Sequence, residues 1–157
     1  VYSYGTEKFA ASCAEVGIDG LILPDVPFEE KEEFAGVCSQ YGLDFISLIA
    51  PTSRDRIAMI AKEAKGFLYV VSSLGVTGMR SEITTDIGSI IQLIKENTDL
   101  PCAVGFGIST PRQAAEMAQW ADGVIVGSAI VKLAGQYGKE AAGPVGEYVK
   151  SMKDAIR

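Results

Sequence analysis

Glycines follow two apolar runs near the end of the sequence, each directly before the pattern of a helix. Gly107 comes shortly after the run Cys102–Val104. Gly127 and Ser128 come directly after the run Val124–Val126. A glycine before a helix lets bare backbone N–H groups point at an anion, and the helix dipole adds to the attraction. The pair of loops predicts phosphate binding, and the competing interpretation is that these glycines only form tight turns.

A third glycine-containing segment, 72–85, exceeds the usual length of about two to six residues for such a connection. Gly75 and Gly78 stand on either side of Thr77. Two glycines can hinge a loop, so the segment is predicted to be a lid whose Thr77 hydroxyl reaches inward to the ligand. The alternative is a solvated surface loop.

Groups for general acid and base catalysis are scarce in this chain. There is no histidine, and such catalysis usually needs histidine or two carboxylates in different environments. Asp25 is the one acid that the pattern assigns to the end of a strand. It is expected to contact substrate or a partner chain, and the alternative for a lone acid is an ordinary loop hydrogen bond.

Four apolar or aromatic residues belong to the strands or their ends: Ile22, Ile49, Tyr69 and Phe106. They are candidates for the wall of a pocket for a flat aromatic ring, and their competing interpretation is plain core. The three cysteines are too few and too far apart for a metal cage, and their odd number argues against a disulfide framework. No metal site is predicted.

The elements that must position these residues alternate regularly along the chain. Short apolar runs of the kind found in buried parallel strands alternate with runs of helical period. Strands are predicted at 21–23, 45–49, 67–71, 102–104 and 124–126. Helices are predicted at about 6–16 and 28–41, around Ile57 to Ala64, around Ile87 to Ile94, from Pro111, at 128–132 and at about 143–152.

Five strand-then-helix units behind a leading helix predict an all-parallel sheet in a single α/β domain over residues 1–157. Ligands bind at the carboxyl ends of the strands both in a (β/α)8 TIM barrel and in a doubly wound sheet. Periodicity leaves both open. The barrel phosphate site lies after strands seven and eight, so the glycine loops after the fourth and fifth strands here favour a partial barrel lacking three strands.

The amino-acid composition limits the classes of binding partner. The net charge is −6 over 157 residues, which argues against nucleic acid and acidic membranes as partners. No apolar run approaches the roughly 18 residues of a membrane span, and a cytoplasmic location is expected. The first residue is Val1, directly before a predicted helix, so the start of the chain is expected to be a truncation.

Five stretches of the sequence are distinctive when taken in order: VYSYGTEKFAASCAEVGIDGLILPDVPFEE, IAPTS, YVVSSLGVTGMR, DLPCAVGFGIST and ADGVIVGSAIV. Together they resemble the α-subunit family of the tryptophan synthases, and the resemblance extends from Val1 to about Ile156. GFGIS or GSAIV alone would suit several phosphate-binding barrels. PDVPFEE and GVTG together with them are specific to this family.

The resemblance implies a retro-aldol cleavage of indole-3-glycerol phosphate to indole and glyceraldehyde 3-phosphate, in a lyase of tryptophan biosynthesis. It implies no cofactor on this subunit, and a pyridoxal-phosphate-dependent β subunit as partner in an α2β2 heterotetramer. The implied phosphate-binding residues are Gly78, Gly107, Gly127 and Ser128. The implied indole pocket consists of Ile22, Ile49, Tyr69 and Phe106, with Thr77 on the closing loop and Asp25 at the rim near the β subunit.

The resemblance also implies an absence. The two catalytic carboxylates of the family, a glutamate and an aspartate, would precede Val1, so no catalytic residue is expected in this chain. These 157 residues are therefore expected to bind phosphate weakly or not at all, and not to turn over substrate. Two alternatives remain: another phosphate-binding barrel enzyme, or a non-catalytic module that binds or activates a β subunit.

Overall fold

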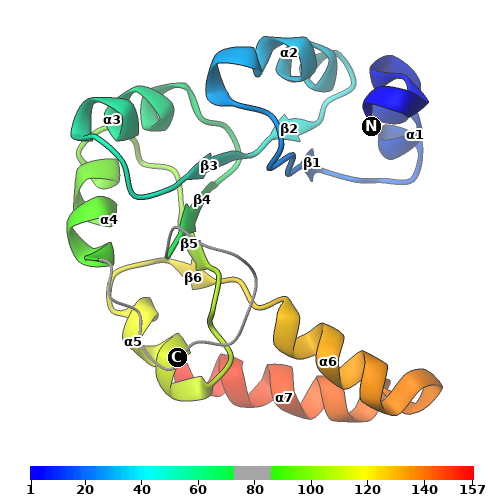
Figure 1. Ribbon diagram of the computed structural model, residues 1–157, viewed down its shortest axis with the longest axis vertical. Coiled ribbons are helices and arrows are strands. Elements are labelled where there is room, and N and C mark those ends of the chain that lie inside the picture. The colour runs from blue at the N-terminus through cyan, green and yellow to red at the C-terminus, as the bar shows by residue number, and fades with distance from the viewer. Residues whose placement is uncertain (73–85) are drawn as a thin grey trace.

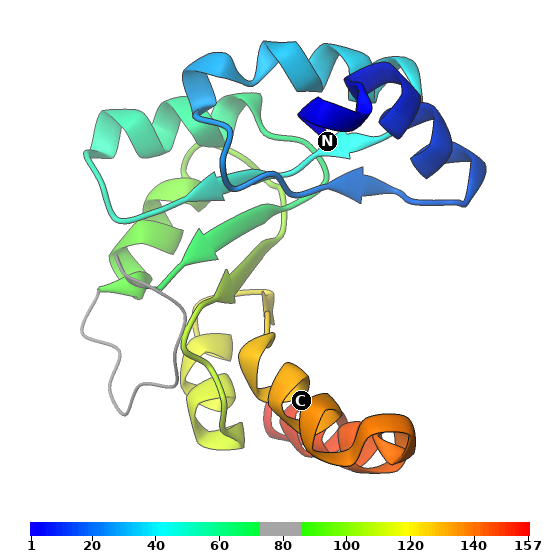
Figure 2. The ribbon, with the colours of Figure 1, turned by 45° about the vertical axis from the view of Figure 1, so that its right-hand side comes forward.

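The computed structural model describes residues 1–72 and 86–157. Parallel strands line the inner side of a crescent, and helices cover its outer side (Figures 1 and 2). The helices are η1 Tyr2–Tyr4, α1 Thr6–Glu15, η2 Phe28–Glu30, α2 Glu32–Gln40, α3 Arg54–Glu63, α4 Ile87–Lys95, α5 Pro111–Ala118, α6 Ser128–Tyr137, η3 Gly138–Glu140 and α7 Ala142–Ala155. The strands are β1 Gly20–Leu21, β2 Asp44–Phe45, β3 Ser47–Ile49, β4 Leu68–Val71, β5 Cys102–Gly105 and β6 Gly123–Val124.

All strand pairs are parallel, in the order β1-β2 and β3-β4-β5-β6. The segments β2 and β3 are two parts of one stretch that changes its paired neighbour at Ile46. The N–H of Ile46 still donates to the carbonyl of Leu21 at 2.9 Å, on the β1 side, whereas β3 pairs with β4. Such staggered pairing is what tilted barrel strands require. The five predicted strands and the partial-barrel fold class are confirmed.

The main core lies between one face of the sheet and the helices. Leu68 and Val70 of β4 and Cys102 and Val104 of β5 are fully buried. They pack against Ile57 and Ile60 of α3, Ile87, Ile91 and Ile94 of α4, and Met117 of α5, within one hydrophobic cluster. The alternate residues of β4, such as Tyr69, are only half-buried. This alternation separates a helix-covered face from the inner face of the crescent.

Local sequence fixes where the helices start and stop. The side chains of Ser53 and Asp86 accept the backbone N–H groups of Arg56 and Ser89, which caps α3 and α4. The first helix, predicted at about 6–16, is confirmed as α1. Gly17 follows it with a φ of 79°, a conformation that suits a glycine after a helix. A smaller buried cluster packs α1 against α2. It consists of Ala10, Cys13, Cys38 and Leu43.

The structure corrects several predicted boundaries. The strand predicted at 45–49 is interrupted at Ile46, because its two halves pair with different strands. The helix predicted at 28–41 begins as the separate turn η2 and continues as α2. The tail helices predicted at 128–132 and about 143–152 extend further, as α6 and α7. The longer α7 packs against both α5 and α6. The end strands β1 and β6 are shorter than predicted.

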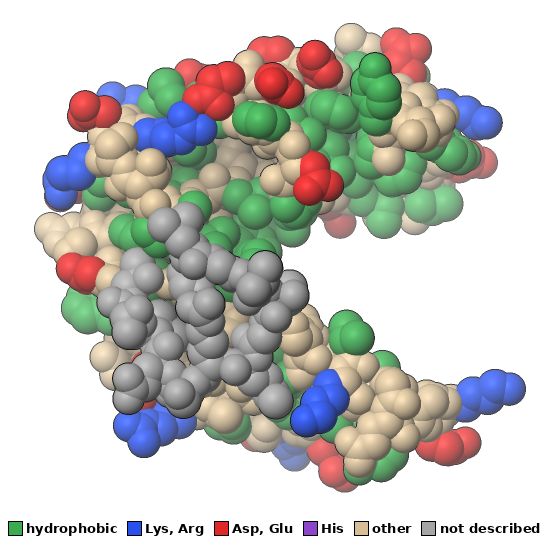
Figure 3. All heavy atoms as spheres, viewed as in Figure 1, with side chains coloured by type: hydrophobic (Ala, Val, Ile, Leu, Met, Phe, Trp, Pro, Cys, Tyr) green, Lys and Arg blue, Asp and Glu red, His purple; other side chains and the backbone are tan. Residues whose placement is uncertain are grey.

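The open side of the crescent carries apolar surface. Hydrophobic side chains gather on the arm that α1, α2 and β1 form, where this arm faces the opening (Figure 3). Large exposed apolar residues include Ile18 and Ile22 beside β1, and Val131 and Val149 on α6 and α7. Among the described strands, β1 and β6 each pair on one side only. Among the described residues, no helix combines the length and apolarity needed to span a membrane.

Replacement of Ile60 by alanine tests the packing of α3 on the sheet. Ile60 is 4% exposed in the main core, whereas its neighbour Met59 is 39% exposed. Ile60→Ala is expected to lower the free energy of unfolding by about 2–5 kcal/mol. Met59→Ala is expected to change it by less than about 0.5 kcal/mol. Urea denaturation of both variants measures this, and equal losses would contradict the orientation of α3.

Candidate functional site

The ends of β4 and β5 form the centre of the candidate site. Val71 pairs with Gly105 in the parallel register, and the N–H of Ser72 donates to the carbonyl of Gly105 at 3.0 Å. The two strands therefore end at the same level. Because carboxyl ends of parallel strands meet at one edge, the loop after β5 lies beside the end of β4.

Tyr69 and Phe106 make an aromatic corner at this edge. Their ring centroids are 6.0 Å apart and their planes are inclined by 70°, an edge-to-face arrangement. A Cβ atom on Gly105 would lie 2.2 Å from the hydroxyl oxygen of Tyr69. Position 105 must therefore be glycine for the Tyr69 ring to lie where it does. The structure brings two of the four predicted pocket residues together.

The backbone after β5 takes an uncommon turn. Phe106 has a φ of 73° and Gly107 a φ of 80°. Glycine adopts positive φ readily, but a phenylalanine there is an outlier that its surroundings must hold. The Ser72 hydroxyl supplies one such support, since its Oγ donates to the carbonyl oxygen of Phe106 at 2.5 Å.

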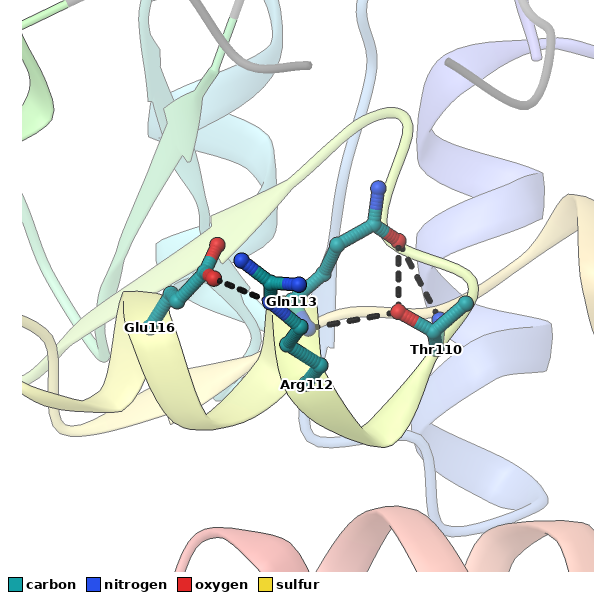
Figure 4. Close-up of polar contacts among 4 residues, drawn as sticks. All are labelled: Thr110, Arg112, Gln113 and Glu116. Atoms are coloured by element: carbon teal, nitrogen blue, oxygen red, sulfur yellow. Dashed lines mark hydrogen bonds and ion pairs between the residues drawn. The ribbon is translucent and has the colours of Figure 1, made fainter. Parts of the chain in front are cut away.

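A capping box fixes the other end of this loop, at the start of α5. Thr110 Oγ1 accepts the N–H of Gln113, and Gln113 Oε1 accepts the N–H of Thr110 at 3.2 Å (Figure 4). Gln113 Oε1 also accepts the N–H of Ser109 at 2.9 Å. From α7, the Tyr148 hydroxyl donates to the carbonyl of Ser109 at 2.9 Å. The helix predicted from Pro111 is confirmed, and its N-cap is Thr110.

The second glycine loop lies at the start of α6, after the neighbouring strand β6. Gly127 is the N-cap of α6 and Ser128 is its first residue, and both are exposed. No side chain caps this helix start. A Cβ atom on Gly107 or on Gly127 would meet nothing within 4 Å. Both glycines therefore border open space on that side, next to paired strands.

Comparison with known proteins agrees with this geometry. The family described as "Tryptophan synthase alpha chain" matches residues 1–157. The tryptophan synthase alpha chain of Lactiplantibacillus plantarum is 49% identical over 157 residues, which is 99% of this chain and 59% of that protein. The chain belongs to the tryptophan synthase alpha chain family.

Solved structures agree with the assignment. Tryptophan synthase of Mycobacterium tuberculosis superimposes with a TM-score of 0.84 at 34% identity, over 100% of this chain and 59% of that chain. The tryptophan synthase a2b2 complex of Pyrococcus furiosus contains a chain with a TM-score of 0.84 at 32% identity, over 98% of this chain and 62% of that chain. The present chain thus spans about three fifths of the length of these tryptophan synthase relatives.

The structure places the remaining predicted site residues in different environments, some exposed and one buried. Ile22 lies just after β1 and is 41% exposed. Ile49 is fully buried in the main core and pairs in register with the buried Val70, so it has no open surface in this structure. Its role in a pocket wall stays a prediction. Asp25 is exposed in the loop after β1. Thr77, Gly78 and Gly75 lie outside the described residues.

Sequence patterns missed a polar link that holds the loop after β1. Glu29, which is not among the predicted site residues, is paired with the guanidinium of Arg56 on α3. This hydrogen bond lowers the pKa of Glu29. Lys31 Nζ lies 2.6 Å from Glu63 Oε2 and 4.3 Å from the ring centroid of Phe28. Within the described residues, no cluster of side chains could hold a metal ion.

The contact of Tyr69 with Gly105 yields a prediction. Gly105→Ala forces the Tyr69 ring to move, and overpacking of this kind costs about 1–3 kcal/mol of unfolding free energy. We expect this loss in urea denaturation, together with loss of the nuclear Overhauser contacts between the Tyr69 and Phe106 rings. Gly123→Ala is the control, because its new Cβ would lie 3.9 Å from the nearest atom. Equal stability of the two variants would refute the close approach.

Burial of Tyr69 yields a pH prediction. Desolvation raises the pKa of its phenol from the ordinary 10.0, so the folded chain keeps this proton at a pH where the unfolded chain loses it. The resulting stability is complete below about pH 10 and is lost as the pH rises through the folded pKa. Between about pH 8 and about pH 11, wild type should lose more unfolding free energy than Tyr69→Phe, because the variant has no phenol at this position to ionise. Tyr2→Phe, at an exposed position, controls for losing any phenol, and an unchanged difference contradicts the prediction.

Proposed function

We propose that this chain is the C-terminal portion of the single barrel domain of a tryptophan synthase alpha chain, and that it supplies the substrate-binding side. The reaction is the retro-aldol cleavage of indole-3-glycerol phosphate to indole and glyceraldehyde 3-phosphate. The observation that carries the proposal is the pair of open glycine loops after β5 and β6, next to the Tyr69–Phe106 corner, in a chain of this family. The site is proposed to act in the cytoplasm.

The phosphate group is proposed to bind at the two glycine loops. Gly107, Gly127 and Ser128 offer backbone N–H groups and a hydroxyl at one sheet edge, and the N-terminus of α6 adds a favourable dipole. Gly78 is proposed to contribute from the loop after β4. A barrel phosphate site after the last two strands has the same geometry.

The indole ring is proposed to bind against the apolar side of the same edge. Tyr69 and Phe106 present ring faces and edges there, and Ile22 adds exposed apolar surface. Ile49 is proposed to support this wall from the core. Thr77 is proposed to act from a closing loop, which would exclude water during the reaction.

The proton transfers are proposed to depend on a glutamate and an aspartate that are not among these 157 residues. Retro-aldol cleavage needs a base and an acid at the glycerol hydroxyl and the indole ring. Asp25, exposed beyond β1, is proposed to form part of the rim instead. No cofactor is proposed for this chain.

A β subunit is the proposed protein partner. One structural relative, from Pyrococcus furiosus, is described as an a2b2 complex with mutual activation. The exposed Asp25 lies in the loop after β1, and Glu29 of the same segment is paired with Arg56 on α3. This loop is proposed to lie at the rim of the site. A heterotetramer with a pyridoxal-phosphate-dependent β subunit is proposed to receive the indole there.

Indole release from indole-3-glycerol phosphate tests the proposal. The chain matches 59% of the Lactiplantibacillus plantarum relative. It is assayed alone and then mixed with the rest of that relative, which is proposed to be its N-terminal portion. We expect activity only in the mixture. Activity of the chain alone would refute the assignment of the carboxylates. Absence of activity in a folded mixture, with retained binding to a β subunit, would favour the non-catalytic binding module.

Ser128 offers a sharper test in the active mixture. Ser128→Ala removes one hydroxyl donor to the phosphate, and we expect KM to rise about fivefold, the equivalent of one lost hydrogen bond. Ser39→Ala, at an exposed position on α2, is the matched control and should leave KM within about twofold. An unchanged KM in Ser128→Ala would remove this residue from the proposed phosphate site.

A further inference from the structure

Ser72 is a buried polar residue to which the proposed binding roles give no task. Its side chain is 1% exposed, and only Ser47 accompanies it as a buried polar residue in the described part of the chain. A buried hydroxyl needs a partner. Ser72 Oγ finds it in the carbonyl of Phe106, which is 34 residues away in sequence. The bond therefore links the end of β4 to the loop after β5.

This bond acts on the one residue of the loop whose conformation needs support. Among the described residues, Phe106 is the only one other than glycine with a positive φ, 73°. A side chain disfavours that conformation, so external contacts must maintain it. By fixing the direction of the Phe106 carbonyl, Ser72 fixes the peptide plane that carries the N–H of Gly107.

The other end of the loop is held independently. Tyr148 donates to the carbonyl of Ser109, and Gln113 accepts the N–H of Ser109. The segment between the two supports contains Gly107, whose missing side chain leaves open space beside it. The loop is thus anchored at both ends, with the proposed anion-binding amide between the anchors.

We infer that Ser72 is a positioning residue for phosphate binding: its hydroxyl holds Phe106 at positive φ, so that the Gly107 N–H is oriented toward the anion before binding. This rests on the proposed function in one respect, that the loop after β5 binds the phosphate. A preorganised donor binds more tightly because no ordering cost remains at the moment of binding. Ser72 itself touches no ligand in this account.

Two variants at this position separate the hydroxyl from the space it fills. Ser72→Ala removes the donor, and Ser72→Cys fills similar space with a much weaker donor. Ser47→Ala is the matched control at the other buried serine, which lies at the start of β3. All are made in the full 157-residue chain, alone and mixed with the N-terminal portion of the Lactiplantibacillus plantarum relative.

Two quantities are measured by nuclear magnetic resonance: the ¹³Cα and ¹³Cβ shifts of Phe106, which report its backbone conformation, and the dissociation constant of inorganic phosphate from the Gly107 amide shift. In Ser72→Ala and Ser72→Cys we expect Phe106 to lose its positive-φ shifts. We expect phosphate to bind at least about fivefold more weakly, the fold-change of one lost hydrogen bond. In Ser47→Ala both quantities should stay as in wild type, even at equal thermal destabilisation.

The possible outcomes distinguish failure of this inference from failure of the proposed function. Wild-type shifts at Phe106, or unchanged phosphate affinity, in folded Ser72→Ala overturn the inference. If Ser72→Ala does not fold, Ser72→Cys decides by the same two quantities. If wild type binds no phosphate at the Gly107 amide, the proposed anion site fails and the inference falls with it, and the Phe106 shifts alone then show whether Ser72 still sets the loop conformation.

Discussion

The parallel pairing of β4 with β5 is the constraint on which the candidate site depends. It places Val71 opposite Gly105, and the positions of Tyr69, Ser72 and the loop after β5 follow from that register. Leu68 and Val70 on β4, with Cys102 and Val104 on β5, are fully buried under the helices. A slip by one residue would exchange the buried and inner faces of a strand, so the core packing fixes the register strongly.

The register gives each group at the site edge its neighbour. It puts the Tyr69 ring over Gly105, where a side chain would collide, and it puts Ser72 beside the Phe106 carbonyl. The capping box of α5 and the Tyr148 hydroxyl then fix the far side of the loop. The loop geometry is therefore set by the sheet and by two helices, which is how a rigid scaffold usually supports a binding loop.

Those parts of the fold that rest on local patterns were predictable from the sequence. Five parallel strands, the stop at Gly17 and the start of α5 at Thr110–Pro111 all follow from short-range residue preferences. The interruption at Ile46 was not predictable, because it reflects a change of partner strand and the apolar run continues through it.

The supports of the candidate site were missed for a similar reason. Ser72 bonds to a residue 34 positions away and Tyr148 to one 39 positions away, and neither contact leaves a periodic signal. Tyr148 was assigned to a helix by its spacing, but its hydroxyl contact depends on how α7 packs against α5. Residue type alone also does not show which side chains meet at a pocket. Of the predicted pocket residues, Tyr69 and Phe106 are in contact, whereas Ile49 is buried in the core.

Native-state hydrogen exchange of the backbone amides tests the central claim most directly. The amides of Leu68 and Ser72 donate to the carbonyls of Pro101 and Gly105. If the β4–β5 pairing is the constraint that holds the site, these amides should exchange only through the opening of highest free energy, close to global unfolding. The amides of α1 and α6 should exchange faster. Rapid exchange at Leu68 and Ser72, with slower exchange in α6, would contradict the account.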